Sequence, residues 1–125
     1  MATLLAGGRQ PVHAAQKLDG TEPALGFIND LDDKDKRRVL RLFEKKAAGH
    51  ALSPEDFRKL RDGLFEFKDF QIRMPCFSTP KGWFVTHGFI KKKEGRTPES
   101  EIARADLIRS EFLKRPENQA KGTKK

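Results

Sequence analysis

The chain has 125 residues, which is enough for one hydrophobic core and too few for two domains of ordinary size. Its 26 Lys and Arg residues against 18 Asp and Glu residues give a formal net charge of +8, which favours polyanionic partners and makes nucleic acid the leading partner class. A single cysteine, Cys76, excludes an intramolecular disulfide, and the three histidines lie too far apart for a metal site. We therefore expect a cytoplasmic protein that uses no metal or cofactor.

The N-terminal third predicts two helices. Residues 1–10 carry no apolar period, so we expect a flexible start, and the apolar run at Leu4 and Leu5 is too short for a signal peptide or membrane span. Residues 11–18 are a candidate first strand. From Glu22 onward, two apolar faces recur at helical spacing and predict a helical hairpin that ends near Gly49. The faces consist of Phe27, Ile28 and Leu31, and of Val39, Leu40, Phe43 and Ala47.

The middle of the chain predicts an antiparallel meander. Ser53-Pro54-Glu55-Asp56 is typical of a helix start, so we expect a short helical turn that Gly63 closes. Three near-alternating runs follow, at residues 64–68, 71–77 and 83–90, with turn residues between them. Pro75 lies within the second run, and we expect it at a sheet edge or a bulge because proline cannot donate a ladder hydrogen bond.

The C-terminal part predicts one helix and a tail. Thr97-Pro98-Glu99 supplies a cap and a proline at the first helical position, and Ile102, Ala105, Ile108 and Phe112 form one helix face. Residues 116–125 are polar and basic, and we expect them to be disordered beyond a single domain at residues 1–115. The expected fold class is α+β, with an N-terminal helical hairpin packed on a small curved antiparallel sheet and a C-terminal helix.

One face of this meander could carry chemistry. A two-residue turn at Asp69 and Phe70 would place Glu66 opposite Arg73 and Lys68 opposite Gln71. The apolar face would then collect Phe65, Phe67, Ile72, Met74 and Cys76, and the polar face Glu66, Lys68, Gln71 and Arg73. A slip of one residue would break this separation of apolar from polar side chains, so the pattern supports the register.

The polar face has the residue types that cleave RNA without a metal. That reaction needs a base for the 2′-hydroxyl proton, cations for the charge that develops on phosphorus oxygens, and an acid for the leaving oxygen. The candidates for these roles are Glu66, Lys68, Arg73, His87, Lys91 and Lys92, and further candidates for RNA binding are Lys59, Arg61, Lys93 and Arg96.

Each candidate also has a structural interpretation. A cross-strand ion pair between Glu66 and Arg73 could serve the fold alone. His87 lies between Val85 and Phe89, so a core histidine is at least as good an interpretation as a catalytic one. The lysine run at residues 91–93 could be a solvated strand end.

Several motifs, taken together and in order, resemble the phage-derived, HigB-like branch of the RelE/ParE superfamily, the toxins of type II toxin–antitoxin systems. They are residues 59–68 (KLRDGLFEFK), Arg73, residues 86–92 (THGFIKK), Thr97-Pro98 and residues 101–105 (EIARA). The resemblance runs from about Gly20 to Leu113.

The resemblance implies a toxin that cuts mRNA on the ribosome, without a metal, and that pairs with an antitoxin, often of the helix-turn-helix type. By motif position, Arg73 would stabilise the phosphate, Lys68 would be next, and Lys91 or Lys92 would complete the cationic set. Relatives place a tyrosine near the site, whereas this chain has none, so the role of that tyrosine would be either absent here or taken by His87 or Glu66. Two alternatives stay open: a ParE-like gyrase inhibitor, and a module that binds RNA or ribosomes without cutting.

Overall fold

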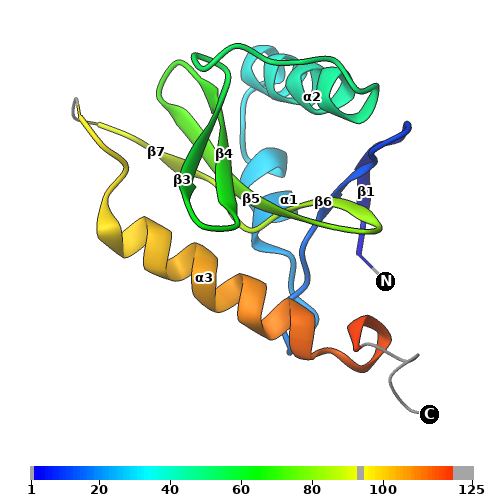
Figure 1. Ribbon diagram of the computed structural model, residues 1–125. Coiled ribbons are helices and arrows are strands. Elements are labelled where there is room, and N and C mark those ends of the chain that lie inside the picture. Colours follow the sequence, from blue (N-terminus) through cyan, green and yellow to red (C-terminus); the bar gives the residue numbers. More distant parts are fainter. Residues whose placement is uncertain (1, 93–94, 120–125) are drawn as a thin grey trace.

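The computed structural model describes residues 2–92 and 95–119 (Figure 1). Seven strands form one sheet in the order β1-β2-β6-β5-β4-β3, and β7 also pairs with β5. The strands are β1 (Leu4–Ala6), β2 (Val12–Ala14), β3 (Phe57–Arg61), β4 (Leu64–Asp69), β5 (Ile72–Thr79), β6 (Gly82–Val85) and β7 (Phe89–Ile90). The helices are α1 (Pro23–Asn29), α2 (Asp33–Ala47), α3 (Glu99–Lys114) and the short 3-10 helix η1 (Pro116–Asn118).

The sheet corrects the predicted fold class. It is mixed, because β2 runs parallel to β6, and it is larger than the small antiparallel sheet that we expected. Two strands precede the helices, and α1 has only seven residues, so the expected N-terminal helical hairpin on a small sheet is wrong. Strand β2 lies within the strand predicted at residues 11–18, but its parallel pairing with β6 was not predicted. Strand β1 has three residues, too few to show an apolar period, and it joins the sheet through backbone pairing.

Two further local predictions differ from the structure. The expected flexible start contains β1, and the expected helical turn after Ser53 is largely the strand β3. In the predicted disordered tail, Pro116–Asn118 forms η1, where the Asn118 side chain donates to the Phe112 carbonyl at 2.8 Å. The rest of that tail, residues 120–125, lies outside the described residues.

Helices cover both faces of the sheet, with α2 above it and α3 below it in Figure 1. The face under α1 and α2 packs Ile28, Val39, Phe43 and Ala47 against Phe67 and Met74. On the opposite face, Ile102, Ala105, Ile108 and Phe112 of α3 are buried with Leu64 and Phe77, as the helical spacing of that segment predicted. Within residues 2–92 and 95–119, no helix is long and apolar enough to span a membrane.

The hairpin of β4 and β5 has a different register from the predicted one. Its turn is Phe70 and Gln71, because Asp69 still pairs with Ile72. Lys68 therefore lies opposite Arg73, and Glu66 opposite Pro75. Each residue of β4 therefore lies opposite a residue two positions later than predicted. Because side chains alternate with a period of two, the predicted separation into an apolar and a polar face is retained.

Pro75 lies in a central strand rather than at an edge, at a gap in the neighbouring pairing. Next to β5, strand β6 ends at Val85 and β7 begins at Phe89, so the intervening residues leave the ladder beside Pro75. The Pro75 carbonyl accepts the backbone N–H of Thr86 at 2.9 Å and its hydroxyl at 3.2 Å. The missing proline N–H is tolerated because the ladder is interrupted there.

Candidate functional site

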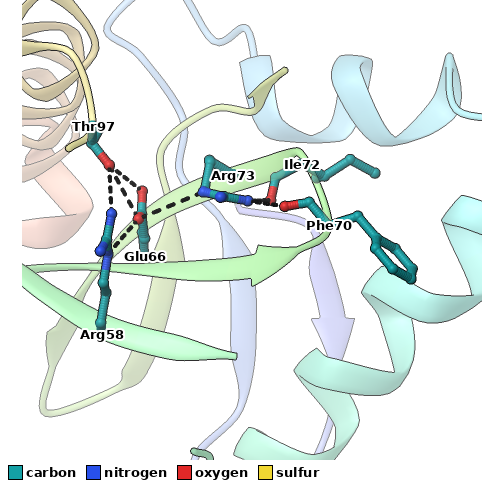
Figure 2. A network of polar contacts seen from close by, with 6 residues as sticks. All are labelled: Arg58, Glu66, Phe70, Ile72, Arg73 and Thr97. Atoms are coloured by element: carbon teal, nitrogen blue, oxygen red, sulfur yellow. Dashed lines mark hydrogen bonds and ion pairs between the residues drawn. The ribbon is translucent and has the colours of Figure 1, made fainter. Parts of the chain in front are cut away.

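A buried carboxylate lies at the centre of the candidate site. Glu66, on the α3 side of β4, is 0% exposed. Arg58 of β3 donates from Nε to its Oε2 at 2.9 Å, and the Thr97 hydroxyl lies 3.0 and 3.1 Å from its two oxygens (Figure 2). Arg73 Nε lies 3.9 Å from Oε2. A buried carboxylate needs such charged and hydrogen-bonding partners, so the network fixes the positions of both arginines.

Arg73 connects this network to the hairpin turn. Its side chain is only 12% exposed, and its Nη1 donates to the Ile72 carbonyl at 3.1 Å and to the Phe70 carbonyl. Figure 2 shows the guanidinium reaching from Glu66 toward these carbonyls. The predicted phosphate-binding arginine therefore also braces the β4–β5 turn.

Lys68 lies among other cations. Lys68 is half-buried and lies opposite Arg73 on the neighbouring strand. Burial is the largest cause of its lowered pKa. The charges of Arg58, Arg73 and Lys91 lower this pKa further, whereas Glu66 raises it. Lys91 follows β7 and is 9% exposed. Its backbone N–H donates to the Gln71 carbonyl at 2.7 Å. A lysine with a lowered pKa loses its proton more readily, which is useful in proton transfer.

A groove of about 360 Å³ opens beside the Glu66 network, between β3 and the start of α3. Its lining contains Arg58 and Thr97, which both bind Glu66, and the predicted RNA-binding residues Lys59, Arg61 and Arg96. Arg61 is held by Glu99 at 2.6 Å and by Asp106 at 3.5 Å. Arg96 also lines a second hollow, of about 450 Å³, with Lys91 and Lys92. The predicted Lys93 lies outside the described residues.

His87 lies beneath this surface rather than on it. It is 0% exposed; its Nε2 lies 2.9 Å from Glu101 Oε1, and its Nδ1 lies 3.0 Å from the Thr86 hydroxyl. Burial is the largest cause of its lowered pKa, with Glu101 acting in the opposite direction. A neutral imidazole that donates from Nε2 to Glu101 satisfies this geometry when the single hydrogen of the Thr86 hydroxyl points to Nδ1 rather than to the Pro75 carbonyl. His87 is connected to the second hollow through Glu101, which lines it.

Two residues of the site, Arg58 and Thr97, were not predicted from the sequence. Arg58 lay in the segment assigned to a helical turn. Thr97 was expected as a helix cap and belongs to a motif of the resemblance, but it was given no role in the site; the N-cap of α3 is Pro98. No local pattern indicates the role of Arg58, because Phe57, Arg58, Lys59 and Leu60 do not alternate between apolar and polar residues, and its place beside Glu66 follows from the pairing of β3 with β4. For Thr97 no sequence signal is evident, because its partner Glu66 lies 31 residues away.

Among the residues that the structure describes, no group of three or more His, Cys, Asp or Glu side chains is placed to hold a metal ion. Cys76 is buried, and burial raises the pKa of its thiol well above the ordinary value.

The fold and the site thus define a small basic protein with a mixed sheet between helices and a cationic groove around one buried carboxylate. Residues 26–109 match the family model described as "Phage derived protein Gp49-like (DUF891)". This match covers more than half of the chain, and the protein belongs to the Gp49-like phage-derived family. No curated protein matches the chain.

Proposed function

We propose that this protein is the toxin of a type II toxin–antitoxin system and that it cuts mRNA on the ribosome. The Gp49-like family is a family of candidate toxins of such systems, which supports the first part. The observation that carries the second is the convergence of Arg58, Lys68 and Arg73 around the buried Glu66, next to a groove with further cations on its rim. The expected partner is an antitoxin protein, of the helix-turn-helix type.

The residues divide into direct and supporting roles. Lys68, half-buried and with a lowered pKa, serves as the base. Arg73 and Lys91 stabilise the negative charge that develops on the phosphorus oxygens. Glu66 and Thr97 are positioning residues, because they hold Arg58 and Arg73 rather than contact the substrate.

The proposed reaction is an attack within the RNA. Lys68, after losing its own proton, takes the proton of a 2′-hydroxyl, and the 2′-oxygen forms a bond to the adjacent phosphorus. The bond from phosphorus to the 5′-oxygen breaks, and an ammonium of Lys91 or Lys92 gives that oxygen its proton. The products are a 2′,3′-cyclic phosphate and a 5′-hydroxyl, with no water consumed in this step.

The test is induction of the wild type and of Lys68→Met in bacteria, followed by mapping of mRNA 5′ ends during translation. Lys68 is preferable to Arg73 as the test position, because Arg73 also braces the turn and its removal would disturb the fold. Lys36→Met, on the half-buried Lys36 of α2, is the matched control for the loss of one positive charge. We expect cuts inside translated frames with the wild type and the control, and their loss with Lys68→Met.

Growth arrest without cuts would overturn the nuclease and direct attention to DNA gyrase, where inhibition of supercoiling would be measured. Cuts that persist undiminished in Lys68→Met would remove this lysine from the catalytic set.

A module that binds RNA without cutting is the second candidate, and one observation favours it. Glu66 is 0% exposed and already surrounded, and the Arg73 guanidinium bonds backbone carbonyls, so two of the predicted catalytic side chains serve the fold. Products with 2′,3′-cyclic phosphate ends would identify the enzyme. Ribosome association without such ends would identify the binder.

A further inference from the structure

A second cationic surface lies along α2, away from the Glu66 network. A groove of about 450 Å³ is lined there by Lys34, Arg37, Arg38, Arg41, Leu42, Lys45, Asp56 and Asp69. Five cations thus face two carboxylates, and one carboxylate, Asp69, is held by Arg38 Nε at 3.0 Å. From Lys34 to Lys45 the cations follow about 16 Å of helix axis, at the rise of roughly 1.5 Å per residue. The groove therefore offers a row of positive charge rather than a single ion pair.

An exposed aromatic ring lies next to Arg38 of this groove. Phe70, in the β4–β5 turn, is 78% exposed, and the Arg38 guanidinium carbon lies 4.8 Å from the centre of its ring. Its φ is 54°, in the left-handed region, where glycine or asparagine would be relaxed and a phenylalanine is strained. Figure 2 shows the ring pointing away from the Glu66 network. Packing of the core does not explain such a ring, because most of its surface faces solvent.

The lining of the groove favours a nucleic acid over a polypeptide. The centre of a protein interface is apolar and poor in charge, whereas Leu42 is the one apolar residue lining this groove and is only 8% exposed. Proteins bind single-stranded nucleic acid with a row of cations for the phosphates and an aromatic ring on which a base stacks. An arginine stacked on the ring adds to such a contact.

We propose that the α2 groove and Phe70 form a second binding surface, for single-stranded RNA, in which the cations of α2 hold phosphates and Phe70 stacks on a base. The choice of RNA over DNA rests on the proposed function; the surface itself does not depend on the cleavage chemistry. Through Arg73, which bonds the Phe70 carbonyl, the surface is physically joined to the candidate catalytic site.

The test is the affinity of the full chain for a fluorescent single-stranded RNA, measured by anisotropy over a range of salt concentrations. All variants carry Lys68→Met, so that the RNA is not cleaved during the measurement. The measured affinity therefore tests the groove even if the nuclease hypothesis is wrong. Arg37→Gln with Arg41→Gln removes two exposed groove cations. Lys36→Gln with Lys114→Gln removes the same charge outside the groove and is the matched control.

We expect the groove variant to bind about tenfold more weakly or worse, and the slope of log affinity against log salt to fall by about 1.4, or about 0.7 for each lost phosphate contact. The control should keep the wild-type slope. An equal loss in both variants would overturn the proposal, because net charge would then explain the affinity.

The ring is tested separately by Phe70→Leu, which keeps an apolar side chain and the net charge. We expect a loss of at least about fivefold for single-stranded RNA, since stacking on one ring is lost, and little change for a duplex of the same sequence, whose bases are not available. Equal losses on single strand and duplex, or none, would contradict the stacking role. Displacement of the RNA by a polyglutamate peptide as readily as by unlabelled RNA would assign the surface to an acidic polypeptide instead.

Discussion

At the scale of single residues, the candidate site depends on hydrogen-bonding partners for the buried carboxyl group of Glu66. Thr97 holds both oxygens of Glu66. Thr97→Val keeps the shape and removes the hydroxyl, so we expect the free energy of unfolding to fall by about 1–3 kcal/mol, the usual effect of leaving a buried polar group without its partner. Denaturant titration at neutral pH measures this. Thr97→Ser restores the hydroxyl and should recover most of the loss; equal stability of Thr97→Val and wild type would show that Arg58 and Arg73 satisfy Glu66 without Thr97.

His87 gives the protein a pH-dependent stability. Burial lowers its pKa in the folded state below 6.5, so the unfolded chain binds more protons than the folded one between these two pKa values. Stability must then fall as the pH drops through and below about 6.5. We expect unfolding titrations from about pH 7 to about pH 5 to show a steeper loss for the wild type than for His87→Gln. His13 shifts in the same direction and stays in both proteins, so the difference isolates His87. Parallel pH profiles would show that His87 titrates normally.

At the scale of elements, the glycine in the motif at residues 86–92, Gly88, is explained by a helix far away in the sequence. A Cβ built on Gly88 would lie 2.2 Å from the ring of Phe27 in α1, so glycine is required there for close packing. We expect Gly88→Ala to reduce stability by about 1–3 kcal/mol, as overpacking does. Phe27→Leu should relieve part of this, giving a coupling energy of about 1 kcal/mol in a double-mutant cycle. Additive effects would place the strain elsewhere.

The length of an element affects how clearly the sequence predicts it. Apolar residues of α2 and α3 repeat over several turns, so Val39, Phe43, Ile108 and Phe112 could be assigned to the core without the structure. Strand β2 lies within the strand predicted at residues 11–18, whereas the three-residue β1 shows no period. The pairing of β1 with β2 and of β2 with β6 depends on backbone hydrogen bonds that leave no residue signal. The face of Lys68 and Arg73 was predicted, because side-chain alternation survives a two-residue shift. Their partners Arg58 and Thr97 come from separate segments, which no local pattern joins.

At the scale of the whole molecule, the chain has a net charge of +8, and the groove beside Glu66 and the groove of α2 are each lined by more cations than carboxylates. If together they contact about six phosphates of a single strand, the slope of log affinity against log salt should be about −4, because counterions leave the RNA on binding. Affinity for ribosomes or RNA should then drop about 300-fold between about 50 and about 200 mM salt. Equilibrium binding at these salt concentrations measures the slope directly. An affinity that does not change with salt would mean that charge does not drive association, and both cationic surfaces would lose their proposed roles.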